Sequence, residues 1–178
     1  MLARLDGGGQ PLGDETSEPR LAAARAAREA EAAGGEPGRV LVEASGTLKS
    51  VRIPEALLVS ALRNLLDNAL RIAPAQTPVL LRIDGGEAQV SFSVLDEGPG
   101  LTEPECALAT QRFWRATHGS LGSGLGLAIT SGIATHYGGR LALSPREPRG
   151  LCASIDLPVA AAEESLAEPP SVVPALHG

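Results

Sequence analysis

Apolar side chains recur at helical spacing in one long stretch of the chain. Between Pro54 and Ile72 they stand three and four residues apart, which places them on one face of a helix. These positions are Leu58, Leu62, Leu65, Leu66 and Ala69. Proline is favoured in the first turn of a helix, so the pattern predicts a helix that starts near Pro54 and buries a leucine face.

Two other stretches also predict helices. Residues 20–33 are almost all Ala, Arg and Glu, which are strong helix formers. Residues 125–137 form the second stretch, close to the C-terminal end of the chain. A pair of glycines follows each stretch, at positions 34–35 and 138–139, and glycine commonly ends a helix.

Alternation of apolar and polar residues predicts strands between these helices. Residues 79–83 and 90–94 alternate on either side of Gly85-Gly86, so we expect two antiparallel strands joined by a tight turn. Residues 40–43 form a short strand, and residues 48–53 are a candidate to pair with it. Two final strands are expected around residues 141–143 and 154–157.

Helices and mostly antiparallel strands in this order predict an α+β fold, a two-layer sandwich with helices on one face of the sheet. We expect one domain over residues 20–159. Residues 1–19 contain a linker rich in Gly, Pro and acids, and residues 160–178 are rich in Ala, Glu, Pro and Ser, so we expect a disordered tail there.

Charge and composition exclude some classes of function. The 178 residues carry a net charge of −6, which argues against binding to a nucleic-acid backbone. Cys106 and Cys152 lack the spacing of a zinc or thioredoxin motif. The sequence has neither a signal-peptide core nor an apolar run of the ~20 residues that a membrane helix needs, so we expect a soluble, cytoplasmic chain without membrane contact.

Three polar segments are candidates for chemistry. Asn64, Asn68 and Arg71 fall on one face of the long helix, where amide oxygens can bind a hard cation and the guanidinium can bind phosphate. The same stripe also fits an ordinary solvated helix face. The segment DEGPG, residues 96–100, follows a strand and places a carboxylate beside glycines that admit a ligand, although it also fits an acidic turn.

The third segment is GSGLGLAI, which leads into the helix at 125–137. Amides of a glycine loop and of a helix N-terminus bind anions. The glycine pattern alone is weak, and it lacks the preceding strand of a Rossmann turn and the GK[ST] of a Walker loop.

The order of NLLDNALR, DEGPG and GSGLGLAI resembles the N, G1 and G2 boxes of the ATP-binding catalytic domain of bacterial sensor histidine kinases, in the GHKL superfamily. QRFWRA resembles the F box, and HYGGRL followed by a strand ending in LP resembles the usual close of these domains. The resemblance spans about residues 57–158. It implies the Bergerat ATP-binding fold, with a mobile lid over about residues 101–123, and ATP and Mg²⁺ as ligands.

The resemblance also implies a role for individual residues. Asn68 would coordinate Mg²⁺, Asn64 would lie beside it, and Arg71 would contact phosphate. Asp96 would accept a hydrogen bond from the adenine amino group, in a pocket shaped by Gly98 and Gly100. The other nucleotide-binding positions that the boxes imply are Ile72, Phe113, Gly122, Ser123, Gly124, Leu125 and Gly126.

Two positions depart from the family pattern. Many members have a tyrosine where this chain has Ile72, so the adenine ring loses a stacking partner. The segment Leu151-Cys152-Ala153 replaces the usual threonines and phenylalanine. We expect weaker nucleotide affinity from both changes.

Position 64 predicts what receives the phosphate. ATP-hydrolysing relatives carry a glutamate there that activates water, and the amide of Asn64 has no useful basicity. We therefore expect transfer to a histidine on a separate helical hairpin, which in turn serves a response regulator. No histidine precedes His118, and MLARLDGG resembles the end of such a hairpin, so we expect a chain that starts after it and is a monomer.

Two alternatives stay open from the sequence. Anti-sigma-factor serine kinases share this ATP fold but usually keep the acidic residue at position 64. A nucleotide-dependent binding module without catalysis also fits the departures at Ile72 and Leu151.

Overall fold

The predicted helices and most of the predicted strands are present in the structure. The computed structural model describes residues 15–34, 37–111 and 125–160. The helices are α1 (Pro19–Gly34), α2 (Glu55–Ile72), α3 (Glu103–Leu108) and α4 (Gly126–His136). The strands are β1 (Val40–Gly46), β2 (Val79–Gly85), β3 (Gln89–Leu95), β4 (Arg140–Pro145) and β5 (Leu151–Pro158).

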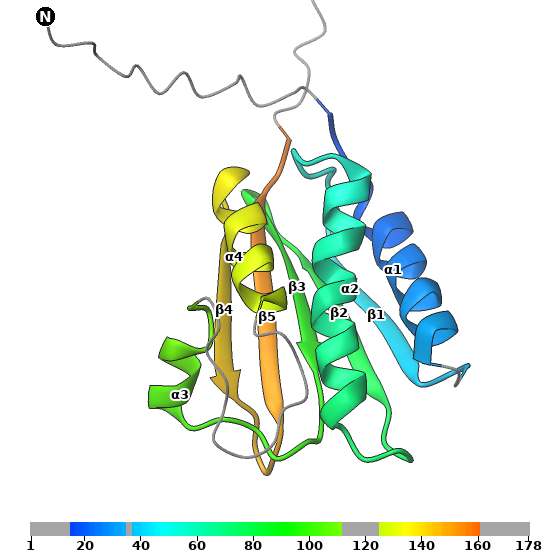
Figure 1. Ribbon diagram of the computed structural model, residues 1–178. Coiled ribbons are helices and arrows are strands. Elements are labelled where there is room, and N and C mark those ends of the chain that lie inside the picture. The colour runs from blue at the N-terminus through cyan, green and yellow to red at the C-terminus, as the bar shows by residue number, and fades with distance from the viewer. Residues whose placement is uncertain (1–14, 35–36, 112–124, 161–178) are drawn as a thin grey trace, which may run out of the picture.

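The strands form one sheet in the order β1-β2-β3-β5-β4, and α1, α2 and α4 lie on one face of it (Figure 1). β1 and β2 are parallel because the chain passes through α2 between them, while the other neighbouring pairs are antiparallel. The predicted α+β two-layer sandwich with a mixed, mostly antiparallel sheet is therefore confirmed.

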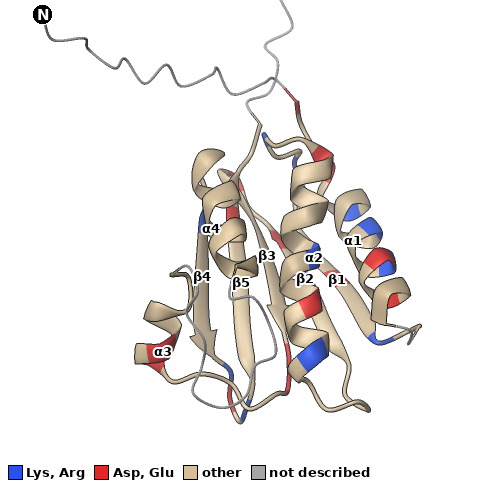
Figure 2. Cartoon of the chain, in the orientation of Figure 1, with Lys and Arg blue, Asp and Glu red and all other residues tan. Residues whose placement is uncertain are grey.

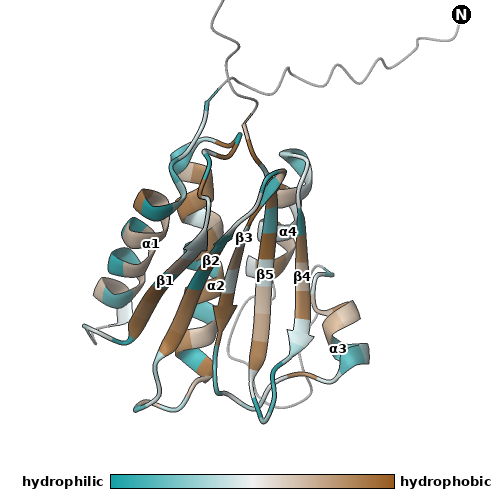
Figure 3. Ribbon diagram, turned by 180° about the vertical axis from the view of Figure 1, so that it is seen from behind, coloured by the Kyte–Doolittle hydropathy of each residue, from teal (hydrophilic) through white to brown (hydrophobic). Residues whose placement is uncertain are grey.

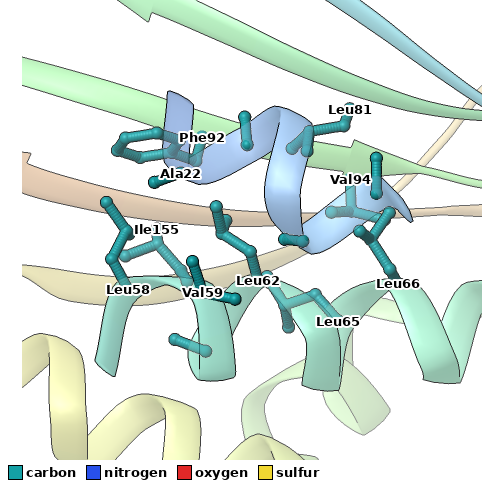
Figure 4. Packing of buried hydrophobic residues seen from close by; sticks show 14 of the residues in the cluster. Ala22, Leu58, Val59, Leu62, Leu65, Leu66, Leu81, Phe92, Val94 and Ile155 are labelled. Atoms are coloured by element: carbon teal, nitrogen blue, oxygen red, sulfur yellow. The ribbon is translucent and has the colours of Figure 1, made fainter. Parts of the chain in front are cut away.

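The leucine face of α2 forms the centre of the core. Leu58, Leu62 and Leu66 are fully buried against alternate residues of the sheet, among them Phe92 and Ile155 (Figure 4). Each such leucine contributes about 1.5–3 kcal/mol by leaving water. This packing fixes the rotation of α2, so the opposite face of the helix, with Asn64 and Asn68, points away from the sheet.

Alanine side chains let α1 pack closely on the same layer. Ala22, Ala23, Ala26 and Ala30 are almost completely buried. The helix starts where the Glu18 carboxylate accepts hydrogen bonds from two backbone amides of the first turn.

The predicted pairing of residues 48–53 with the strand at 40–43 is wrong. β1 pairs with β2 instead, and their register ends where Gly46 lies opposite Gly85. A Cβ atom at Gly85 would lie 2.3 Å from the Thr47 carbonyl oxygen, so the chain passes close to Gly85 as it leaves the sheet. From there Val51 bridges both Ser17 and Val159. Ser17, near the end of the segment that was expected as a linker, is thus bonded to Val51 and Ile53 of the folded domain.

The opposite face of the sheet carries no helix in the parts that the structure describes (Figure 3). The side chains on this face come from the strand positions that alternate with those of the core. Among them, the hydroxyl groups of Ser93 and Ser154 form a hydrogen bond. In the described ranges, none of the helices combines the length and the apolar character that a bilayer crossing requires.

Candidate nucleotide site

The polar face of α2 carries the first group of predicted residues. Asn64 and Asn68 are partly exposed and Arg71 is exposed, one helical turn after another, while Leu65 and Ala69 between them are buried. The amphipathic pattern therefore presents two amides and one guanidinium in a row. Within the described residues no cluster of three His, Cys, Asp or Glu side chains is placed to hold a metal ion. A hard cation at this row would need oxygen ligands from a bound phosphate in addition to the amides.

The first turn of α4 lies over these two amides. A Cβ atom added at Gly126 would be 3.7 Å from the Asn68 Nδ2 atom and 3.9 Å from the Asn64 Cβ atom. One turn further on, Asn64 Nδ2 donates a hydrogen bond of 3.4 Å to the hydroxyl of Thr130, which is fully buried. The positive end of the α4 dipole and its first backbone amides therefore lie beside the amide row, which is the arrangement that binds an anion.

Asp96 lies at the carboxyl end of β3 and is only 2% exposed. Its Oδ1 atom accepts a hydrogen bond of 2.7 Å from the Gly98 backbone amide. Burial raises the pKa of the Asp96 carboxyl above its ordinary value, while hydrogen bonds from the Gly98 and Leu151 amides and the charge of Arg146 oppose the rise. A buried carboxylate of this kind is suited to accept a hydrogen bond from a ligand amine.

The end of α2 meets the loop after β3. A Cβ atom at Gly98 would lie 2.9 Å from Asp96 Oδ1 and 3.3 Å from Ile72 Cγ1, so only glycine leaves this contact undisturbed. Gly100 has a φ of +72°, a conformation that favours glycine. Ile72, Asp96 and Gly98 therefore gather at one end of α2, and Asn64, Asn68 and Gly126 gather along its polar face.

Four predicted positions lie outside the described residues. They are Phe113, Gly122, Ser123 and Gly124. Leu125 is described and is partly buried directly before α4.

Helix α3 occupies part of the predicted lid and was not expected from the sequence. Thr102 and Glu105 form a reciprocal capping box at its start. The spacing T-x-x-E is a recognised signal for a helix N-terminus, so the sequence contained the information that would have identified it.

A hollow of about 300 Å³ lies on the α1 side of α2 and shares Arg71 with the polar row. Its other lining residues are Ala30, Glu31, Ala33, Gly34, Arg39, Asp67 and Leu70. Of these lining residues only Arg71 belongs to the predicted nucleotide site, and neither Asp96 nor Asn68 borders the hollow.

Comparison with known proteins points to one family. Residues 53–161 match the family model described as histidine kinase-, DNA gyrase B- and HSP90-like ATPase. The chain is 38% identical to the sensor protein kinase CarS of Pseudomonas aeruginosa over 102 residues, which cover 57% of this chain and 22% of CarS. It is 31% identical to the sensor protein CreC of Escherichia coli over 121 residues, or 67% of this chain and 26% of CreC.

A solved structure has the same fold over most of the described chain. The mycobacterial sensor histidine kinase MprB superimposes with a TM-score of 0.71 at 26% identity, covering 81% of this chain and 97% of that one. The matched region spans only about a quarter of the length of these curated relatives, which are much longer than this chain.

Proposed function

The chain belongs to the histidine kinase-, DNA gyrase B- and HSP90-like ATPase family, and we propose that it transfers the γ-phosphate of ATP to a histidine on a separate helical hairpin. In this proposal it is the ATP-binding catalytic domain of a sensor histidine kinase. The hairpin then passes the phosphate to a response regulator. The curated relative CarS, named as a sensor protein kinase, supports this assignment.

One observation carries the proposal: a single helix, α2, contacts both glycine-containing segments. Its polar face meets Gly126 at the start of α4, and its end meets Gly98 beside Asp96. A nucleotide that lies along α2 can therefore place its base at Asp96 and its phosphates at Asn68. ATP spans such a site because it carries an amine at one end and an anion at the other.

We assign the individual roles on this basis. The Asp96 carboxylate accepts a hydrogen bond from the adenine amino group, and Ile72 covers the ring. The Asn68 amide oxygen binds the Mg²⁺ that accompanies the phosphates, and Arg71 pairs with a phosphate oxygen. Bound Mg²⁺ neutralises charge on the phosphates and so favours phosphoryl transfer.

The surroundings of Asn64 favour a kinase over an ATP-hydrolysing enzyme. Its amide donates a hydrogen bond to the buried Thr130 hydroxyl, which orients the side chain. An amide has no basic group that could take a proton from water. A water molecule near Asn68 would not be activated by this residue. The phosphoryl group would therefore remain on ATP until a protein nucleophile arrives.

The test has two steps. Calorimetric titration with ATP, with Mg²⁺ and then with a chelator, should show binding that is stronger with Mg²⁺. Radiolabelled ATP is then incubated with the chain and a purified helical hairpin that carries one phosphorylatable histidine, with a His→Ala hairpin as the control.

Acid-labile label on the hairpin, absent from the control, is the expected result, because phosphohistidine is hydrolysed in acid. Acid-stable label would identify a serine kinase instead. Binding of ATP without any transfer would contradict the proposed catalysis.

A further inference from the structure

The turn that joins β4 to β5 lies directly against the loop that contains Asp96. A Cβ atom at Gly150 would be 1.9 Å from the Asp96 carbonyl oxygen, and one at Gly100 would be 2.5 Å from the Gly150 carbonyl oxygen. The Asp96 amide also donates to the Leu151 carbonyl at 3.1 Å. The two backbones are therefore in contact over several residues.

Two arginines of this turn bind carbonyl groups of the loop. Arg146 Nη1 donates to the Asp96 carbonyl at 3.0 Å, and Arg149 Nε donates to the Gly98 carbonyl at 3.2 Å. Arg146 Nη2 also lies 3.7 Å from a carboxylate oxygen of Glu97. Charged positions of the turn and the loop accordingly gather beyond the ends of β3, β4 and β5 (Figure 2).

These contacts determine the orientation of two peptide groups in the loop. Hydrogen bonds to a charged donor are stronger than neutral ones, and the planar guanidinium group is a rigid donor. The peptide group that carries the Gly98 amide lies between these two, and its N–H donates to Asp96 Oδ1 at 2.7 Å. Side chains about fifty residues later in the chain therefore hold the peptide groups on both sides of the one that donates to the Asp96 carboxylate.

We infer that Arg146 and Arg149 are positioning residues that hold the Asp96–Gly98 loop in the conformation that receives adenine. They act through the loop backbone and contact no part of the nucleotide. The inference rests on the proposed function, because it concerns the adenine end of the same site. Arg146 carries a positive charge that also favours the ionised form of Asp96.

The experiment compares two nucleotides and several variants. ATP and purine riboside triphosphate differ only in the adenine amino group, so the ratio of their dissociation constants measures recognition at Asp96. Both are titrated into the wild-type chain, Arg146→Gln, Arg149→Gln, the double variant and the lysine variants of both positions. Arg140→Gln is the matched control, because Arg140 is also on this hairpin but pairs with Asp156 and is 74% exposed.

The double variant should bind ATP about tenfold more weakly, the loss expected when charged hydrogen bonds no longer hold the loop. Its affinity for purine riboside triphosphate should change little, and the lysine variants should recover part of the ATP preference. Arg140→Gln should match the wild type with both nucleotides.

Several results would overturn the inference. One is a double variant that keeps the wild-type preference for ATP. Another is a double variant that loses affinity for ATP and for purine riboside triphosphate by the same factor. If the double variant does not fold, as judged by its thermal transition, the single variants decide by the same ratio. A wild type that binds neither nucleotide contradicts the proposed function itself, and one that binds both equally removes the role of Asp96.

Discussion

Replacing Asp96 by asparagine should weaken nucleotide binding and stabilise the free domain. Burial raises the pKa of this carboxyl above the ordinary value. A carboxyl with a raised pKa in the folded state favours folding only while it is protonated, so this contribution is lost as the pH rises through that pKa. At neutral pH the wild type carries the cost of a buried charge, and Asp96→Asn removes it.

The two effects have opposite signs and separate assays. The bond between the adenine amino group and a carboxylate is of the charged kind that contributes about 1.5–3 kcal/mol, so the dissociation constant for ATP should rise about tenfold or more. Calorimetry measures that rise. Thermal unfolding without nucleotide, followed from acidic to neutral pH, should show a gain in stability over the wild type that grows with pH.

Asp84→Asn provides the control, because Asp84 is exposed and bonds to Ser45 at the edge of the sheet. This control should leave the ATP affinity unchanged, and it should not show the gain in stability with pH that is expected of Asp96→Asn. Unchanged ATP affinity in Asp96→Asn would refute the assignment of the adenine pocket. A variant that loses stability and affinity together would show instead that Asp96 is required for the fold.

Three other substitutions test separate parts of the account. Asn64→Glu places a base one turn before Asn68, so phosphate release from ATP should increase; an unchanged rate would argue against the stated reason for slow hydrolysis. Gly150→Ala forces a side chain against the Asp96 carbonyl at a φ of +115°, and urea unfolding should show a loss of about 1–3 kcal/mol, whereas wild-type stability would contradict the close contact. Leu62→Ala should cost about 2–5 kcal/mol because Leu62 is fully buried. Leu57→Ala, at an exposed position, should cost far less in the same assay, and equal losses would contradict the described core.

The elements with the clearest periodicity were predictable from sequence. α2 is marked by five apolar positions on one face, and the hairpin of β2 and β3 by alternation on both sides of a Gly-Gly turn. The apolar residues of α2 share one face, and the two strands of the hairpin are close in sequence, so the local pattern is enough to predict both elements. The parallel partner of β1 is not local, and for that reason residues 48–53 were assigned a pairing that the chain does not form.

The residues of the candidate site also divide into those that sequence motifs predict and those that only the fold brings together. Asn64, Asn68, Asp96 and Gly98 follow from motifs whose order along the chain is informative, although their roles remain predictions. Arg146, in contrast, contacts Asp96 only because β4 and β5 return to the end of β3. No spacing in the sequence marks such a contact, and the folded backbone was needed to find it.

The most direct test of the central claim is an NMR titration of the isotope-labelled chain with ATP and Mg²⁺. Nucleotide bound along α2 should shift the backbone amide signals of Asn68, Asp96, Gly98 and Gly126 together, at one common dissociation constant. The signal of Ser93, on the opposite face of the sheet, should stay in place. Shifts that spare Asp96 and Gly98, or that spare Asn68 and Gly126, would contradict a single ATP site that joins the polar face of α2 to its C-terminal end.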